Sequence, residues 1–269
     1  MADAIRVAMW SGPRNISTAM MRSFGNRQDT AVIDEPFYAA YLAATGIQHP
    51  LREESLAAQP TDWREVARTV LGPVPGGKPV FYQKHMTHHM LPEFGRDWIA
   101  DCRNAFLIRA PEDVLASYTE KRSEVALEDI GFVQQAEIFE REAERLGIAP
   151  PVIDASDVLR HPRGTLSALC EALDISFADE MLHWPPGRRE TDGAWAPAWY
   201  DAVERSTGFA TARPPVPFEA LRDDLKPIAD AARPYYEKLQ RYRLLPAYGC
   251  RIRNLRGLRG TKRSRHTAS

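Results

Sequence analysis

The sequence predicts an α/β fold of three layers, in which a mostly parallel sheet is covered by helices on both faces. Short apolar segments alternate along the chain with longer segments that have helical periodicity. The apolar segments are nearly continuous, as in strands that are buried on both faces. Strands that are separated by helices form βαβ units, and such units build parallel sheets.

The expected elements follow one another in a regular order. Residues 111–122 begin with a proline and two acids, which is typical of the first turn of a helix. An amphipathic stretch at 126–147 predicts one long helix. The expected strands are 5–10, 30–34, 80–86, 104–110 and 151–155. The other expected helices are 17–27, 37–44, 63–71 and 217–244, the last interrupted at Pro227 and Pro234. Residues 185–215, rich in Pro, Gly and Trp, are expected to form long irregular loops.

The composition is that of one globular unit with a basic tail. Of the 269 residues, 44% are hydrophobic and 26% are charged, which is enough for a real core. Because no internal repeat or second core is evident, we expect a single domain over residues 1–250. Residues 251–269 hold seven of the 35 Lys and Arg residues and no acid, and predict a flexible tail.

Charge, cysteine content and hydropathy narrow the class of protein. The net charge of −1, and a tail without aromatic residues, make nucleic-acid binding an unfavoured reading. The three scattered cysteines fit a reducing compartment better than a disulfide framework. No apolar run approaches about 18 residues, and the N-terminus shows no leader pattern. We therefore expect a cytoplasmic protein without a membrane partner, and the sequence leaves an oligomer possible.

The loop after the first expected strand has the features of an anion site. In "WSGPRNISTAMM" (residues 10–21), the free N–H groups and the dipole of the next helix attract an anion. Gly12 allows a tight turn, and Arg14 adds a planar fork that matches phosphate or sulfate. Ser17 and Thr18 place two hydroxyls at the helix start, although Ser17 is alternatively only a cap. Because Gly-Lys-Ser/Thr is missing, an ATP- or GTP-cleaving P-loop is not predicted.

A second motif, "FLIRAPEDVLASYTEKR" (residues 106–122), points to the same edge of the sheet. Arg109 closes a buried strand, and Ser117 lies eight residues further on, on the following helix. The carboxyl ends of parallel strands share one edge, where ligands bind. Two anion sites on that edge suit a ligand with phosphates at both ends. The alternative is that Arg109 forms a surface salt bridge with Glu112 or Asp113.

In this order, the two motifs resemble those of the sulfotransferases that use 3′-phosphoadenosine 5′-phosphosulfate (PAPS). That family binds the 5′-phosphosulfate with a loop of the form Arg/Lys-Ser-Gly-[ST]-[ST]. Here the loop reads Arg14-Asn15-Ile16-Ser17-Thr18, so that Ile16 stands where the family prefers Gly. The family's 3′-phosphate motif, a strand ending in Arg followed by Pro, Asp-Val and Ser, is matched by Arg109, Pro111, Asp113, Val114 and Ser117.

Further segments extend the resemblance over roughly residues 5–178. "VFYQKHM" resembles the family's Lys-Thr-His strand end, with Lys84 and His85 adjacent. "IDEPF" resembles a Glu-Pro-Phe element of bacterial sulfotransferases, which implies that Glu35 lies near the acceptor. "DASDVLRHPRGTLSALCEALDISF" resembles a helical motif of the family. The loop 184–200 resembles the element that closes over the 3′-phosphate, and alternatively is a surface loop anchored by aromatic residues.

The resemblance implies a P-loop NTPase-like fold and the transfer of a sulfuryl group from PAPS to a hydroxyl or amine of a small-molecule acceptor. The moving group carries one negative charge, so a metal is less necessary than in phosphoryl transfer, and we expect none. The donor-binding candidates are Gly12, Arg14, Asn15, Ser17, Thr18, Arg109, Ser117, Arg188 and Arg189, with Trp195 as an adenine or acceptor contact. The alternatives are a P-loop kinase of a small metabolite and a non-catalytic nucleotide-binding module.

The catalytic candidates are Lys84, His85 and Glu35. Lys84 suits stabilisation of the leaving phosphate. The unperturbed pKa of histidine, about 6.5, suits His85 as the general base. Glu35 competes for that role, but a helix N-terminus after Pro36 is expected to lower its pKa. His85 and His89 would share one face of a helix, as in a zinc motif, but the H-E-x-x-H arrangement is missing and the segment before His85 is strand-like. We therefore expect no zinc site, and we expect His88 and His89 to line the acceptor cleft or to cap the next helix.

Overall fold

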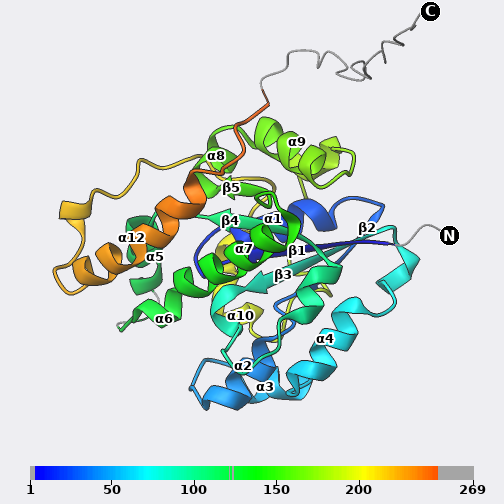
Figure 1. Ribbon diagram of the computed structural model, residues 1–269, viewed down its shortest axis with the longest axis horizontal. Coiled ribbons are helices and arrows are strands. Elements are labelled where there is room, and N and C mark those ends of the chain that lie inside the picture. Colours follow the sequence, from blue (N-terminus) through cyan, green and yellow to red (C-terminus); the bar gives the residue numbers. More distant parts are fainter. Residues whose placement is uncertain (1–3, 121, 123, 248–269) are drawn as a thin grey trace, which may run out of the picture.

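The computed structural model describes residues 4–120, 122 and 124–247 (Figure 1). Five strands form one sheet: β1 (Ile5–Ser11), β2 (Thr30–Asp34), β3 (Val80–Met86), β4 (Arg103–Ile108) and β5 (Val152–Asp154). The strand order is β2-β3-β1-β4-β5, and all neighbouring pairs are parallel. The α/β fold and its five expected strands are confirmed. The expected tail, 251–269, lies outside the described residues.

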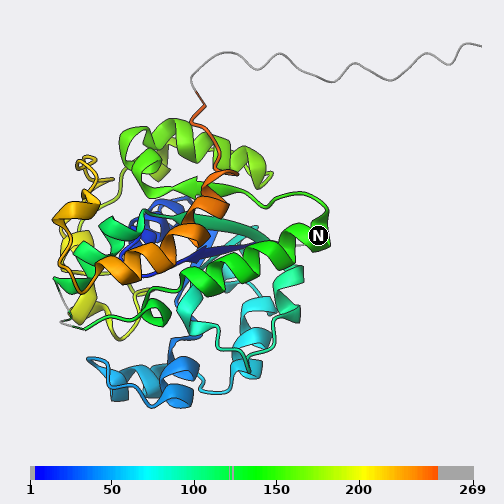
Figure 2. The same cartoon turned by 60° about the vertical axis from the view of Figure 1, so that its left-hand side comes forward.

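Helices cover both faces of the sheet because successive side chains of a strand point to opposite sides. In β1, Val7 and Met9 pack in one core cluster, and Ala8 and Trp10 pack in another. The first cluster is covered by α1 (Ser17–Gly25), α8 (Ala155–Arg160) and α9 (Pro162–Ala172). The second is covered by α4 (Trp63–Leu71), α7 (Phe132–Leu146) and α12 (Lys226–Gln240) (Figures 1 and 2).

The remaining helices are short. They are α2 (Tyr38–Thr45), α3 (Arg52–Ala58), α5 (Pro111–Thr119), α6 (Leu127–Ile130), α10 (Ala196–Trp199) and α11 (Asp201–Glu204). Single 3₁₀ turns lie at Pro75–Gly77, Thr87–His89, Asp97–Asp101, Asp179–Leu182 and Phe218–Ala220. α10 and α11 lie in the segment expected to be irregular, which otherwise runs as loop.

The single long helix expected over 126–147 is wrong. The chain breaks into α6 and α7 at Gly131, which has a φ of 68°. Its carbonyl accepts a hydrogen bond of 2.8 Å from Thr87 Oγ1, and a Cβ atom at this position would lie 2.4 Å from that oxygen. The break therefore lets the backbone pass closely beside the turn that follows β3.

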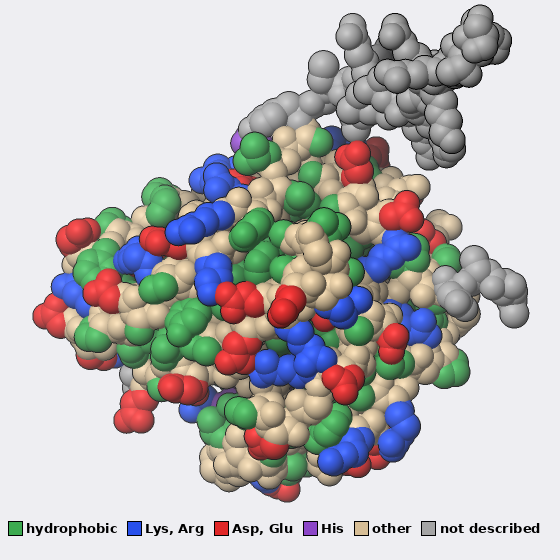
Figure 3. All heavy atoms as spheres, in the orientation of Figure 1, with side chains coloured by type: hydrophobic (Ala, Val, Ile, Leu, Met, Phe, Trp, Pro, Cys, Tyr) green, Lys and Arg blue, Asp and Glu red, His purple; other side chains and the backbone are tan. Residues whose placement is uncertain are grey.

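The expected helix at 217–244 is shorter than predicted. It begins at Lys226, so Pro227 lies in its first turn, where the missing N–H has no partner to lose. The helix then continues through Pro234 instead of stopping there. Within the described residues, no helix is long and apolar enough to cross a membrane. On the face shown in Figure 3, basic and acidic side chains are interspersed.

Candidate active site

A cavity of about 330 Å³ lies at the carboxyl edge of the sheet. It brings together most of the residues that the sequence motifs pointed to. The predicted residues that line it are Arg14, Asn15, Ser17, Thr18, Glu35, Lys84, His88, His89, Arg109, Ser117 and Trp195. Gly12, His85, Arg188 and Arg189 are not among the lining residues.

The loop after β1 presents the uncapped start of α1 to the cavity. The N-cap residue is Ile16, which offers no side-chain acceptor, so the alternative that Ser17 is the cap is wrong. Ile16 adopts the left-handed conformation, with a φ of 46°, which costs a β-branched residue energy but is open to Gly at no steric cost. The family's Gly at this position thus has a conformational reason. No side chain of the N-cap residue satisfies the first N–H groups of α1, which suits an anion at this position.

Gly12 has a different role from the one expected. It does not adopt a positive φ and does not line the cavity. A Cβ atom there would lie 2.5 Å from the carbonyl oxygen of Ile130. Gly12 therefore lets the loop approach the end of α6, and it shapes the site without touching it.

The two predicted anion motifs form one continuous site. Arg14 Nε donates to Ser117 Oγ at 3.0 Å, and Arg109 Nη1 donates to the carbonyl of Arg14 at 2.7 Å. Arg109 also forms the predicted alternative ion pair with Asp113, at 3.8 Å. Burial lowers the pKa of Arg14, and the charge of Arg109 lowers it further. An anionic ligand between the two guanidinium groups would relieve this repulsion.

Asn15 ties the same loop to the sheet. Its Nδ2 donates to the carbonyl of Leu107 in β4 at 2.7 Å. Its Oδ1 is buried and has no hydrogen-bond partner among the described residues. A buried acceptor without a hydrogen-bond partner costs free energy. The Asn15 amide nitrogen holds the loop to β4 and does not donate into the cavity.

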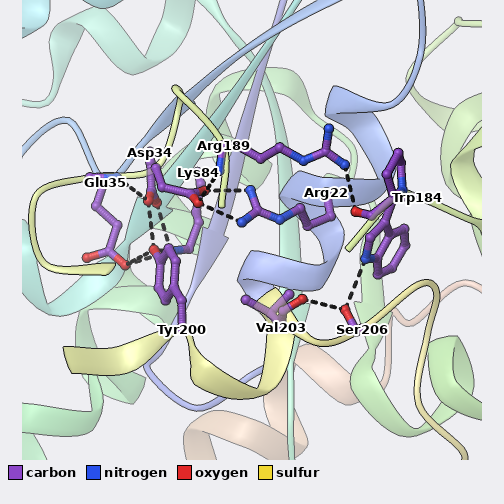
Figure 4. A network of polar contacts seen from close by, with 12 residues as sticks. Arg22, Asp34, Glu35, Lys84, Trp184, Arg189, Tyr200, Val203 and Ser206 are labelled. Carbon is purple, nitrogen blue, oxygen red and sulfur yellow. Dashed lines mark hydrogen bonds and ion pairs between the residues drawn. The ribbon is translucent and has the colours of Figure 1, made fainter. Parts of the chain in front are cut away.

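Lys84 is buried between two carboxylates and a phenol (Figure 4). Its Nζ lies 2.8 Å from Asp34 Oδ1, 2.6 Å from Glu35 Oε1 and 2.6 Å from Tyr200 Oη. Burial acts to lower the pKa of Lys84, but Asp34 and Glu35 outweigh it and hold that pKa well above its usual value. The lysine is therefore charged at the base of the cavity.

Glu35 does not lie in the electrostatic environment that we expected. Helix α2 begins at Tyr38, and Glu35 has a φ of 38° before it. Burial raises the pKa of Glu35, against the lowering effect of Lys84, so the expected lowering is wrong. Its side chain is 12% exposed, and it lines the cavity. A carboxylate that lines the cavity and has a raised pKa is a candidate general base.

His85 is turned away from Lys84, contrary to expectation. Neighbouring residues of a strand face opposite sides of the sheet, and β3 pairs Lys84 with Met9 and His85 with Trp10. The imidazole stacks on Trp10 at 4.6 Å and contacts Gln83 Oε1 through Nε2 at 3.1 Å. Burial lowers the pKa of His85 to about 3. His85 is thus a neutral core residue on the face of the sheet opposite to Lys84.

The loop 184–210, which we call the roof loop, covers the cavity through contacts that the sequence did not reveal. Asp192 forms an ion pair with Arg22 of α1, at 2.5 and 2.7 Å. Asp34 Oδ2 accepts from the Gly193 N–H at 3.1 Å and from Tyr200 Oη at 2.7 Å. The sequence offered one indication of Asp34, because this residue ends a strand and directly precedes Glu35. Tyr200 had no such signal.

The predicted arginines of the roof loop do not reach the cavity. Arg188 is exposed, and Arg189 Nη2 donates to the carbonyl of Pro185 at 3.0 Å. Trp195 is fully buried and packs edge-to-face on Tyr38 at 4.8 Å. The roof loop therefore fits the alternative, a loop anchored by its aromatic residues, better than a loop whose arginines bind the 3′-phosphate.

His88 and His89 lie in the 3₁₀ turn after β3 and line the cavity. Burial lowers the pKa of His88 to about 3 and that of His89 well below its usual value. The Nδ1 atom of each ring is buried without a hydrogen-bond partner in the described part of the chain. No group of three or more His, Cys, Asp or Glu residues among those described has the arrangement of a metal site.

Comparison with known proteins identifies the family. The model of the sulfotransferase domain matches residues 5–242. The chain belongs to the sulfotransferase domain family. The resemblance noted in the motifs is thereby confirmed. The sulfotransferase domain from the curacin biosynthetic pathway superposes with a TM-score of 0.51 and 15% identity, over 91% of this chain and 99% of that one. At this identity the likeness shows the fold, which the two sulfotransferase domains share.

Two curated relatives come from Arabidopsis thaliana. Branched-chain-amino-acid aminotransferase-like proteins 2 and 1 are 35% identical over 217 residues and 36% identical over 211 residues. The matches cover 80% and 78% of this sulfotransferase-domain chain, but 38% of each relative. The chain therefore spans well under half of the length of these relatives, and their name describes the larger proteins.

Proposed function

We propose that the protein is an enzyme that transfers a sulfuryl group from PAPS to a hydroxyl or amine of a small molecule. The observation that carries the proposal is the placement of charge around one cavity. Arg14, Arg109 and the open start of α1 gather at one part of the wall. A buried lysine with a carboxylate beside it, Lys84 and Glu35, lies at another.

The donor would bind across the two motifs. The 5′-phosphosulfate would lie at the start of α1, against the N–H groups, Arg14 and the hydroxyls of Ser17 and Thr18. The 3′-phosphate would contact Arg109 and Ser117, which the Arg14–Ser117 hydrogen bond holds beside the first site. Contacts to both phosphate groups would thus orient the sulfur atom of the donor toward Lys84 and Glu35.

The chemical step then needs a base and a stabilised leaving group. The acceptor oxygen attacks sulfur, the bond from sulfur to the 5′-phosphate oxygen breaks, and the acceptor proton passes to the Glu35 carboxylate, whose Oε1 already accepts from Lys84. The products are the sulfate ester and 3′-phosphoadenosine 5′-phosphate (PAP). Charge grows on the 5′-phosphate as the sulfuryl group leaves, and the fixed cations Arg14 and Lys84 stabilise it.

Calorimetry tests the choice of donor. We expect PAP to bind to the protein, and ATP with Mg²⁺ to bind much more weakly. Tight binding of ATP with Mg²⁺ and no response to PAP would favour the small-metabolite kinase instead. Radiolabelled PAPS offered with a panel of alcohols and amines tests the transfer, and PAP binding without any transfer would favour the non-catalytic nucleotide-binding module.

A further inference from the structure

Three side chains from separate segments form a chain of hydrogen bonds that ends at the cavity wall. Arg122 Nη1 lies 2.6 Å from Nε2 of His49, and Nδ1 of the same ring lies 2.8 Å from Tyr38 Oη. Tyr38 opens α2, His49 follows that helix, and Arg122 follows α5. Tyr38 and His49 line the cavity. None of the three was singled out by the sequence motifs.

The chemistry of the three groups fixes the direction of these bonds. A guanidinium group can only donate, so Nε2 of His49 accepts from Arg122. In a neutral imidazole the proton is then on Nδ1, which donates to the oxygen of Tyr38. Because that oxygen already accepts this bond, the Tyr38 proton is left to donate to another group, and the cavity adjoins it.

The surroundings keep both groups neutral. Burial lowers the pKa of His49 to about 4, and the charge of Arg122 lowers it further, whereas Asp129 raises it. Tyr41 and His88 also face these rings. Burial raises the pKa of Tyr38. Tyr38 is held in place as well, because it stacks on His89 at 5.0 Å and meets Trp195 edge-to-face.

The group of the acceptor that contacts Tyr38 has to carry a lone pair. The Tyr38 proton is left to donate, and an ammonium group has no lone pair with which to accept it. Among the described lining residues, the one carboxylate is Glu35, which is already paired with Lys84, so an ammonium group finds no free carboxylate there. The wall around Tyr38 consists otherwise of uncharged rings, including His88, His89, Tyr118, Trp195 and Trp199.

We propose that Tyr38 holds the acceptor through a hydrogen bond from its hydroxyl, and that this acceptor is an alcohol without an ammonium group. His49 and Arg122 are positioning residues that fix the direction of the Tyr38 proton. The proposal rests on the sulfotransferase function proposed above, and it narrows the acceptor from alcohols and amines to uncharged alcohols. The Tyr38 hydroxyl contacts a second oxygen of the acceptor, which leaves the reacting hydroxyl to Glu35.

The tautomer of His49 can be measured without knowing the acceptor. Nitrogen NMR of the full chain labelled at histidine, with His49 assigned by comparison with His49→Gln, should show the Nδ1–H tautomer. That signal should persist from pH 8 to about pH 5, because the pKa of His49 is lowered. A signal from the Nε2–H tautomer, or a titration near pH 6.5, would overturn the proposed direction.

Matched acceptors and variants test the rest. With radiolabelled PAPS, 2-(4-hydroxyphenyl)ethanol should be a better acceptor than tyramine, and pentanediol better than aminopentanol, by roughly tenfold or more in kcat/KM, because the first of each pair offers Tyr38 a second oxygen and the other an ammonium group. Tyr38→Phe should raise the acceptor KM by about five- to tenfold, the worth of one neutral hydrogen bond, with little change in kcat. His49→Leu should have the same effect, whereas His49→Gln, whose amide can accept and donate in the same order, should restore it.

The outcomes separate this inference from the proposed function. Equal or better turnover of the ammonium-bearing acceptors overturns the assignment of an acceptor oxygen at Tyr38. Binding of PAP with no turnover of any of the four alcohols also counts against an alcohol acceptor. An increase of the acceptor KM in His49→Gln as large as that in His49→Leu would make the histidine merely structural. Failure to bind PAP at all contradicts the proposed sulfotransferase, and the NMR result still decides the direction of the Tyr38 proton.

Discussion

Arg14 and Ser117 are 103 positions apart in the chain, yet the arginine Nε donates to the serine Oγ at 3.0 Å. This bond joins the loop after β1 to the helix after β4. Since Arg109 binds the backbone of Arg14, the two motifs form one surface with two cations. The proposed nucleotide donor would bind to cations that the protein itself holds together, so little ordering cost would be added on binding.

Loss of Arg109 should weaken the binding of PAP. Arg109→Ala removes a hydrogen bond to a charged group, which is worth about 1.5–3 kcal/mol, and should leave the fold intact. Calorimetry with PAP measures the loss. Arg188→Ala is the matched control, because Arg188 is exposed and does not line the cavity. An unchanged affinity in Arg109→Ala would remove this residue from the donor site.

Loss of Arg14 should affect the chemical step more than donor binding. Charge develops on the 5′-phosphate in the transition state, so Arg14→Ala should lower kcat by a larger factor than it lowers the affinity for PAPS. Single-turnover kinetics and PAP calorimetry, carried out on one preparation, separate the two quantities. Equal losses in both would make Arg14 a binding residue alone.

The pH–rate profile should report on Glu35. Its pKa is raised by burial, so the carboxylate becomes protonated, and inactive as a base, as the pH falls through a value above the usual range for glutamate. Glu35→Gln should lower kcat by about 10²–10⁴-fold and remove this acidic limb. His85→Phe is the control variant, because His85 stacks on Trp10 in the core, on the face of the sheet opposite to Lys84. Loss of the limb in His85→Phe alone would return the role of base to His85.

The buried histidines should make the fold sensitive to acid. The pKa values of His85 and His88 are lowered to about 3 in the folded chain, whereas about 6.5 is expected when it is unfolded. The unfolded chain therefore binds more protons between these values, and stability falls as the pH drops below about 6.5. Urea unfolding at pH 7.5 and pH 5.5 measures the difference, and His85→Phe should reduce it. An identical difference in His85→Phe would show that His85 becomes protonated without unfolding.

Two glycines with the same backbone conformation offer a matched pair. Gly131 and Gly147 have φ values of 68° and 69°, but a Cβ atom at Gly131 meets Thr87 Oγ1 at 2.4 Å, and one at Gly147 meets nothing within 4 Å. Gly147→Ala should cost about 1–2 kcal/mol from the left-handed conformation alone. Gly131→Ala should cost more in urea unfolding, by about 1–3 kcal/mol of overpacking. Equal losses of stability in the two variants would show that the turn at Thr87 moves aside without a cost in free energy.

The strands and both anion motifs could be predicted because their signals are local. Each strand is a short apolar run, and each motif is continuous in sequence next to a strand end. The break at Gly131 could not be predicted, because its cause is Thr87, 44 positions away. The exclusion of His85 was within reach, since the alternation of a strand puts it on the side opposite to Lys84.

The parts of the site that were missed all depend on contacts between distant segments. Tyr200 reaches Lys84 across 116 positions, and Arg122 reaches His49 across 73. Each stands at the last position of a stretch that the sequence pointed to, 184–200 and 106–122, but neither residue carried a signal of its own. The raised pKa of Glu35 likewise follows from burial under the folded chain, which no run of neighbouring residues encodes.

The two carboxylate oxygens of Asp34 accept hydrogen bonds from different parts of the site. Oδ1 accepts from the ammonium of Lys84, while Oδ2 accepts from the Gly193 N–H and the Tyr200 hydroxyl of the roof loop. The contacts that hold the roof loop and those that hold the ammonium group of Lys84 therefore meet at a single carboxylate. Tyr200 binds both Lys84 and Asp34, so a substitution at Asp34 would disturb the cover of the cavity and its central cation together.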